Sequence, residues 1–392
     1  MWILGRIKHI VLRIVLASYL RILALFIKVD KKVVLFSSFT GKAYSDNPKY
    51  IYEFMRQQPE FADYQFIWAL QQPRQVEGAT VIRYNSLQYY YFLTKAKYWV
   101  FNAKMAPYYY KRSNQVYLQT WHGTPLKRLA HDIIDDGKTY YRTRSSYQQM
   151  VQSYDKDSRK WDYLIATSPF SKDAFSTAFR YPKEKMLLAG YPRVAALVNA
   201  TEETKNQLKK KYQLPKDKRI ILYAPTWRDD DFGMSGYNHR LAVDFALWKE
   251  QLGEEFVVLF KPHYLIANHY TVPQELEEFV FVMDAHADIN DAYLVSDILI
   301  TDYSSVFFDF AVLNRPIYFY MYDFEKYQQQ LRGFYLTIPE DLPNEVIQTE
   351  RELLEQLKQE PFDYERLTRF NQRFNPYSDG QATEKIVKEM IK

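Results

Sequence analysis

Two histidines stand directly after strand-like segments, and imidazole is the side chain that most often takes a proton from a hydroxyl near neutral pH. His122 lies in TWHGTP, after the apolar run 116–120, and His263 lies in LFKPHY, after the run 256–260. A lone histidine is more often a hydrogen-bonded structural residue. Two at strand exits, one in each half of the chain, instead predict a functional pair.

The residues around these histidines suit transfer of a phosphoryl group. Gly123 permits a tight turn after His122, while Thr124 and Pro125 have the types that cap and open a helix. Lys261 lies two residues before His263 and places a cation beside the imidazole. A transferring phosphoryl group needs such neutralising charge.

A third cluster, TDYSSVFFDF, has the pattern of an anion site at a helix start. The buried run 298–301 ends, and Ser304 and Ser305 open an apolar helix whose free N–H groups and dipole favour phosphate. Asp309 follows one turn later, where its carboxylate could face a ribose hydroxyl. The alternative is plain capping of the helix by Ser304 or Asp302.

Two arginines also follow strand-like runs. Arg228, in YAPTWRDD, could hold a phosphate with two parallel hydrogen bonds, or it could pair with Asp229 or Asp230. Arg193, in GYPR, closes the first half of the chain. It could reach a diphosphate, or it could be a surface arginine in a turn.

These clusters require a scaffold of parallel strands. Near-continuous apolar runs alternate with helical stretches, which indicates parallel sheets covered on both faces. The candidate strands are 33–38, 66–70, 80–83, 98–101, 116–120, 163–166, 186–189, 220–224, 256–260, 279–282, 298–301 and 317–320. The charged segment 199–219 separates the first seven from the last five.

We therefore predict an α/β protein of the GT-B-like class, with two facing Rossmann-type domains and a cleft between them. The length of 392 residues fits two domains. We expect an acceptor-side domain at 31–200 and a nucleotide-binding domain with C-terminal helices at 201–392. Ligands of such sheets bind beyond the carboxyl ends of the strands, where the clusters lie.

Residues 1–30 are predicted to form an amphipathic helix that associates with a membrane. Residues 1–32 carry a net charge of +6, whereas the remaining 360 residues carry −1. On a helix, one arc of about 120° holds most of the cations, and the other face is apolar. The arc contains Arg6, His9, Arg13, Arg21 and Lys28. Such a helix suits an anionic membrane surface, and the alternative is an ordinary helix packed on the body.

The composition excludes several classes of site. The chain has no cysteine, so disulfides, zinc–thiolate sites and iron–sulfur clusters are excluded. P-loop, dinucleotide-binding and HExxH motifs are missing from the sequence, and no spacing suggests metal ligands. We expect neither a cofactor nor a metal. The body of the chain is nearly neutral, and we expect no nucleic acid partner.

The motifs QTWHGTPLKRL, YAPTWRDD, KPHY, TDYSSVFFDFAVLNRPIYFYMYD and RGFY together resemble the CDP-glycerol glycerophosphotransferase family, the teichoic acid enzymes of Gram-positive bacteria. The resemblance implies a GT-B fold and peripheral attachment to the cytoplasmic side of the cell membrane. It also implies transfer of glycerol phosphate from CDP-glycerol to a teichoic acid precursor linked to undecaprenyl diphosphate, with release of CMP.

The same resemblance implies roles for individual residues. His122 is similar to the family's catalytic base, and His263 to a second essential histidine that contacts the diphosphate. The implied substrate-binding residues are Trp121, Gly123, Thr124, Pro125, Arg193, Pro225, Thr226, Arg228, Lys261, Pro262, Ser304, Ser305 and Asp309.

Other activities fit the same sequence. The donor could be CDP-ribitol, or the enzyme could be a primase that adds only the first glycerol phosphate. A nucleotide-sugar glycosyltransferase or epimerase could use the same architecture, because a fold does not fix chemistry. Release of CMP would mark phosphotransfer, whereas release of UDP would mark glycosyl transfer.

Overall fold

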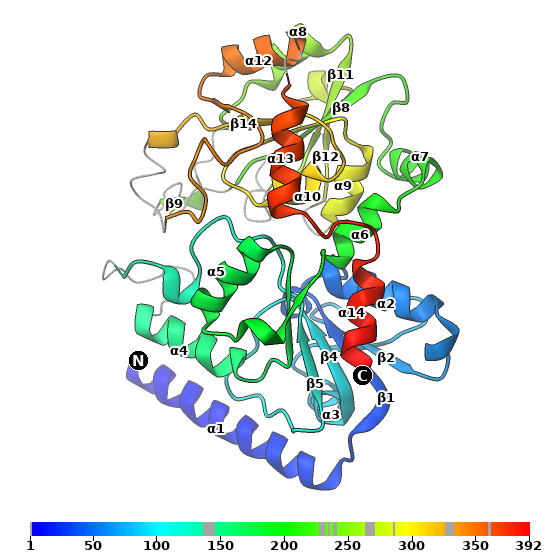
Figure 1. The fold of residues 1–392 in the computed structure, drawn as a ribbon, viewed down its shortest axis with the longest axis vertical. Helices are drawn as coiled ribbons and strands as arrows, with labels where there is room; N and C mark the ends of the chain where they lie inside the picture. Colours follow the sequence, from blue (N-terminus) through cyan, green and yellow to red (C-terminus); the bar gives the residue numbers. More distant parts are fainter. Residues whose placement is uncertain are drawn as a thin grey trace. The chain divides into compact units, whose positions relative to one another are not determined.

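The chain forms two compact units (Figure 1). The computed structural model describes residues 2–135, 146–226, 232–233, 236–237, 241–262, 271–284, 287–325, 333–359 and 362–392. Unit 1 comprises residues 1–122, 129–193 and 381–392, and unit 2 comprises residues 123–128 and 194–380.

Unit 1 is built on a parallel sheet of seven strands in the order β3-β2-β1-β4-β5-β6-β7. Its strands are β1 (Asp30–Ser37), β2 (Gln65–Leu70), β3 (Thr80–Arg83), β4 (Ala96–Phe101), β5 (Val116–Gln119), β6 (Tyr163–Ala166) and β7 (Met186–Leu188). The central strands β1 and β4 are buried on both faces over most of their length, and their buried residues are mainly apolar. All seven predicted strands of the first series are confirmed.

Helices cover this sheet, and three of them begin at serine caps. The helices are α1 (Trp2–Phe26), α2 (Asp46–Gln57), α3 (Leu87–Lys95), α4 (Tyr147–Ser158), α5 (Pro169–Phe179) and α14 (Ala382–Ile391). Ser86 and Ser168 accept hydrogen bonds from the first turns of α3 and α5, and Ser146 forms a capping box with Gln149. The helix α14 lies against α2 (Figure 1) and buries Ile386, Val387 and Met390.

One side of α1 packs on unit 1, and the other side is open. Leu20 is fully buried in the core of unit 1, and α1 lies against α3 (Figure 1). The Arg112 guanidinium donates to the carbonyls of Ala24 (3.1 Å) and Ile27 (2.7 Å), which satisfies acceptors that a helix end leaves free. The C-terminal end of α1 is therefore tied to unit 1.

The open side of α1 is apolar. Val15, Ile22 and Phe26 have exposed fractions of 55%, 54% and 80%. Arg13 and Arg21 are exposed on the same helix, and the Arg21 guanidinium lies 6.0 Å from the centre of the Tyr110 ring. None of the helices in the described part of the chain combines the length and apolarity that crossing a bilayer requires. Binding of α1 to a membrane surface stays a prediction.

Unit 2 is built on a parallel sheet of six strands in the order β12-β11-β8-β13-β14-β15. The strands are β8 (Arg219–Ala224), β11 (Phe256–Phe260), β12 (Val280–Val282), β13 (Ile298–Thr301), β14 (Ile317–Tyr320) and β15 (Val346–Ile347). The five predicted strands are confirmed, and β15 was not predicted. A two-residue hairpin, β9 (Phe232–Gly233) and β10 (Gly236–Tyr237), forms a separate small sheet.

The helices of unit 2 are α7 (Glu202–Lys211), α8 (Phe245–Leu252), α9 (Ile289–Val295), α10 (Val306–Ala311), α12 (Glu350–Gln359) and α13 (Tyr364–Phe374), and α6 (Pro192–Val198) contains the junction between the units. Two helices of unit 2, α10 and α13, pack on each other through aromatic rings. The ring of Phe308 lies 5.4 Å from that of Phe370 and 5.5 Å from that of Phe374, which fixes α10 against α13.

The segment after His122 departs from the predicted helix at Pro125. Residues 126–128 instead pair with residues 333–335: the Arg128 N–H donates to the Gly333 carbonyl (3.0 Å), and the Tyr335 N–H donates to the Leu126 carbonyl (2.9 Å). The helix prediction is therefore wrong. The contact joins TPLKRL to RGFY, two motifs about 200 residues apart in the sequence.

Candidate functional site

A strained turn after β5 presents His122. Trp121 has a φ of 55°, a left-handed conformation that is uncommon for a bulky residue. Its N–H donates to Gln119 Oε1 (3.0 Å), and its carbonyl accepts from Thr120 Oγ1 (3.0 Å) and Asn47 Nδ2 (3.2 Å). Side chains from two elements thus hold the backbone in this turn.

The His122 ring is fixed between aromatic neighbours and one hydrogen bond. It stacks on Trp121, with ring centres 4.5 Å apart, and it meets the edge of Phe39 at 5.7 Å. Its Nδ1 lies 2.7 Å from the carbonyl oxygen of Asn102. A carbonyl oxygen can only accept, so Nδ1 carries the hydrogen, and Nε2 of the neutral ring keeps a lone pair. This arrangement suits a general base.

The surroundings of His122 favour its neutral form. The side chain is exposed, yet the protein atoms crowded around the ring disfavour its charged form and lower its pKa. The Asn102 carbonyl and the Asp46 carboxylate oppose this effect, and the Arg193 guanidinium adds to it. A base of lowered pKa is already unprotonated at neutral pH.

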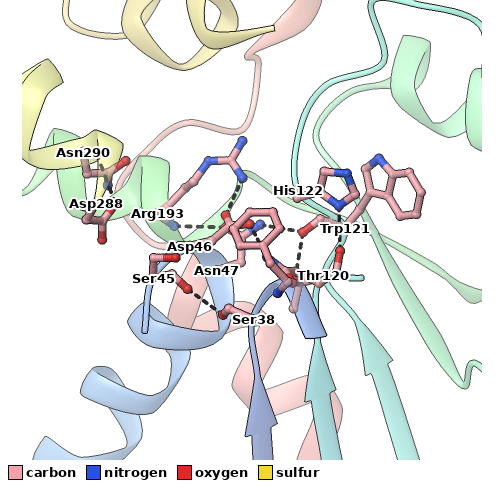
Figure 2. Close-up of polar contacts among 12 residues, drawn as sticks. Ser38, Ser45, Asp46, Asn47, Thr120, Trp121, His122, Arg193, Asp288 and Asn290 are labelled. Carbon is pink, nitrogen blue, oxygen red and sulfur yellow. Dashed lines mark hydrogen bonds and ion pairs between the residues drawn. The ribbon is translucent and has the colours of Figure 1, made fainter. Parts of the chain in front are cut away.

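A hydrogen-bond network connects Asp46, Asn47 and Arg193 with the turn that carries His122 (Figure 2). Asp46, at the start of α2, is buried: its Oδ1 lies 2.5 Å from Arg193 Nη1, and its Oδ2 accepts from Asn102 Nδ2. Asn102 Oδ1 in turn accepts from the Phe39 N–H (2.7 Å). Asn47 Oδ1 accepts from the Arg193 N–H (3.2 Å). The network joins α2, α6 and the exits of β1 and β4.

The sequence interpretation missed Asp46, Asn47 and Asn102. Asn102 directly follows β4, and the pair Asp46–Asn47 opens α2 soon after β1, so both lie at the sheet edge where the other candidates were sought. Arg193 was considered as a diphosphate ligand. The structure buries its side chain against Asp46, and the diphosphate role stays a prediction.

In unit 2, three adjacent strand exits bring predicted residues together. The exits of β8 and β13 are joined by two hydrogen bonds: the Thr226 N–H donates to Asp302 Oδ1 (2.8 Å), and Thr301 Oγ1 donates to the Ala224 carbonyl (2.8 Å). Asp302 therefore holds the segment that follows β8, which includes Pro225 and Thr226. Ser305 stands at the start of α10 without a side-chain cap bond, and Asp309 is buried on that helix.

Lys261 follows β11 and is held by main-chain oxygens. Its Nζ donates to the carbonyl of Ala287 (3.2 Å) and to that of Asp284. Burial lowers the pKa of Lys261 to about 8, although Asp284, Asp288 and Asp291 act in the opposite direction. Pro262 is buried next to it. His263 and Arg228 lie outside the described residues.

Gly123 and Ser305 lie side by side within unit 2. A Cβ atom at Gly123 would come within 3.0 Å of Ser305 Oγ, a distance that requires the serine to move. Thr124 and Pro125 are buried in the same segment. Within unit 2, Gly123 of the first motif therefore contacts Ser305 of TDYSS.

This contact gives a stability prediction. We expect Gly123→Ala to lower the free energy of unfolding by about 1 kcal/mol and to lower the melting temperature. This is the lower end of the range for overpacking, because the serine hydroxyl can rotate. In a Ser305→Ala background, where Oγ is missing, the same change should cost less. A thermal-melting double-mutant cycle measures the difference. Equal costs in both backgrounds would contradict the contact.

The chain is similar to proteins of known activity. The family model of CDP-glycerol:poly(glycerophosphate) glycerophosphotransferase matches residues 19–392. A teichoic acid poly(glycerol phosphate) polymerase of Staphylococcus epidermidis is 39% identical over 91% of this chain and 50% of the relative. A teichoic acid glycerol-phosphate transferase of Staphylococcus aureus is 37% identical over 93% of this chain and 94% of the relative.

A solved structure supports the fold. A variant of the wall teichoic acid polymerase TagF, soaked with CDPG, is 36% identical and superposes with a TM-score of 0.89, covering 99% of this chain and 95% of that one. The GT-B-like fold predicted from the sequence is confirmed. The chain spans about half the length of the curated polymerases that it matches first.

Proposed function

This chain belongs to the CDP-glycerol:poly(glycerophosphate) glycerophosphotransferase family, and we propose that it transfers glycerol phosphate from CDP-glycerol to a lipid-linked teichoic acid precursor. The observation that carries the proposal is the exposed His122 ring, whose Nδ1–H is bound to the Asn102 carbonyl so that Nε2 is left to accept a proton. The acceptor is a chain linked to undecaprenyl diphosphate, and the other product is CMP.

In the proposed reaction, a hydroxyl of the acceptor gives its proton to His122 Nε2. The hydroxyl oxygen then attacks the β-phosphorus of CDP-glycerol, forming a new phosphodiester bond. The bond between the β-phosphorus and the oxygen that bridges it to the α-phosphorus breaks, and CMP leaves with that oxygen. His122 acts as general base, and the charge that develops on the phosphates needs fixed cations and N–H donors.

Unit 2 supplies the groups for the donor. Lys261, the Thr226 turn and Ser304–Ser305 follow β11, β8 and β13, three neighbouring strands whose carboxyl ends share one edge of the sheet. His263, two residues after Lys261, is assigned to the diphosphate by the resemblance. The protein holds the donor without a cofactor in this proposal.

The proposed location is the cytoplasmic side of the cell membrane, with α1 lying on the surface. The acceptor is a membrane lipid, so surface attachment raises the local concentration of enzyme near its substrate. The open apolar side of α1 and its exposed arginines support this placement.

The decisive assay incubates the full chain with CDP-glycerol or CDP-ribitol and a defined lipid acceptor, and measures product mass and released nucleotide. We expect CMP and products heavier by glycerol phosphate units. Ribitol phosphate products would assign the other polyol, and a single addition would indicate a primase. UDP release from UDP-sugars, with no CMP from either donor, would contradict the proposal.

Lys261 gives a prediction for donor binding. Lys261→Met should weaken binding of CDP-glycerol about 10- to 100-fold, because hydrogen bonds to charged groups contribute about 1.5–3 kcal/mol. Below the pKa of about 8, Lys261 is charged, so affinity of the unmodified protein should fall as the pH rises above 8. Calorimetric titration at pH 7 and pH 9 measures both effects.

Lys249 provides the matched control, because its Nζ also donates to a main-chain carbonyl, that of Glu275 (2.5 Å), but its side chain is exposed on α8. Lys249→Met should bind CDP-glycerol as the unmodified protein does. A Lys261→Met protein with unchanged affinity would remove Lys261 from the donor site.

A further inference from the structure

We infer that Asp46 and Arg193 act as positioning residues for His122, a role that rests on the proposed function of His122 as the base. Asp46 holds the Asn102 segment whose carbonyl receives the imidazole Nδ1–H, and Arg193 holds Asp46 in place. Neither residue needs to touch the substrate for this role.

The conformation of Asp46 shows that its place is determined by its surroundings. It has a φ of 60° at the first position of α2, a backbone conformation that costs energy for a residue with a side chain. Both carboxylate oxygens are used, one by Arg193 and the other by Asn102. Such strain persists only when the neighbouring contacts compensate for it, and it is common at functional sites.

The burial of the pair also indicates a role beyond stability. Asp46 and Arg193 are only 6% and 4% exposed. Removing two charges from water costs about as much as their attraction returns, so a buried ion pair is weak support for stability alone. A pair placed beside a proton-transfer group, however, can define its orientation and its charge.

Two hydrogen-bond routes lead from this pair to the histidine turn (Figure 2). Through Asn102, Asp46 fixes a side chain that also accepts from the Phe39 N–H, and the Asn102 carbonyl then meets His122 Nδ1. Through Asn47, the Arg193 N–H is connected to the Trp121 carbonyl. The second route uses the main-chain N–H of Arg193, so substitution of the side chain leaves it in place. Loss of either charge therefore acts on the His122 ring through Asn102, which Asp46 holds.

The two charges act on His122 in opposite directions. Asp46, from α2, favours the imidazolium, and Arg193, from α6, disfavours it. The other neighbours within unit 1 are uncharged: Phe39 follows β1, Asn102 follows β4, and Trp121 packs on Phe179 of α5. Opposite shifts of the His122 pKa on removal of the two charges would distinguish this role from simple structural support.

The test is the pH dependence of kcat/KM in Asp46→Asn and Arg193→Gln, together with NMR titration of the His122 ring. Because the neutral ring is the active form, activity falls as the pH drops through the imidazole pKa. Asp46→Asn should move this acidic limb about one unit lower, and Arg193→Gln about one unit higher. Arg193→Lys keeps the charge and should restore the limb to its position in the unmodified enzyme.

Binding of CDP-glycerol should change less than threefold in Asp46→Asn, because Asp46 has no proposed contact with the donor. The inference would be overturned if the acidic limb of the pH profile stayed in place in both variants. It would also be overturned if the limb moved in the same direction in both. If Asp46→Asn does not fold, Arg193→Gln and Arg193→Lys still decide it. The NMR titration needs no substrate, so it tests the pair even if the transfer reaction itself is not observed.

Discussion

His122→Ala is expected to lower kcat by about 10²- to 10⁴-fold, the usual contribution of a positioned general base. The affinity for CDP-glycerol should change little, because Lys261, Thr226 and Ser304–Ser305, which are proposed to bind the donor, lie in unit 2. Turnover with radiolabelled CDP-glycerol and a lipid acceptor measures the first effect, and calorimetry measures the second. A variant that turns over as fast as the unmodified protein would exclude His122 as the base.

The pH profile of the unmodified enzyme should reflect the lowered pKa of His122. Activity persists at neutral pH and is lost only as the pH falls through that lowered value, because protonation removes the lone pair on Nε2. His131 is a matched control: its Nε2 lies 2.7 Å from Asp155 Oδ1, elsewhere in unit 1. His131→Ala should leave this limb of the profile in place.

Glutamates on the open side of α1 should abolish binding to anionic vesicles. The variant is Val15→Glu combined with Ile22→Glu and Phe26→Glu. Each new charge near an anionic surface costs about 1 kcal/mol, and each lost apolar side chain removes part of the roughly 1.5–3 kcal/mol that full burial provides. Together, these free-energy changes correspond to more than a 100-fold loss of affinity for vesicles. Flotation with vesicles measures this loss directly.

The control also has three substitutions to glutamate, but at exposed apolar positions outside α1. Ile134→Glu, Val198→Glu and Tyr364→Glu fulfil this condition, with exposed fractions of 72%, 42% and 48% at the original residues. This control should float with the vesicles as the unmodified protein does. If the α1 variant also floats, another surface binds the membrane. Activity on a water-soluble acceptor should survive in both.

The strands could be predicted because parallel strands buried on both faces are apolar runs that the sequence displays directly. All twelve predicted strands exist, whereas the two-residue strand β15 is too short to produce such a signal. The helix expected at Pro125 was wrong for another reason. Its residue types favour a helix start, but pairing with residues 333–335 gives Leu126 and Arg128 other hydrogen-bond partners.

Residues of the candidate site could be predicted only where a reactive or charged side chain comes soon after a strand in the sequence. His122, Lys261 and Ser305 were found by that rule, and the structure places each at a carboxyl strand end. The rule did not identify Asp46, because the role inferred for Asp46 depends on contacts with Asn102 and Arg193, which are 56 and 147 residues away in the sequence. No local pattern reports such contacts, nor the left-handed backbone at Asp46 and Trp121.

The return of α14 to unit 1 has a consequence for biosynthesis. The ribosome must complete all of unit 2 before residues 381–392 emerge, and only then can Ile386, Val387 and Met390 cover α2. Until that moment, the surface of α2 that α14 covers is exposed. A nascent chain arrested before residue 381 should therefore be a better client for chaperones, and more easily cut by protease near α2, than the released protein.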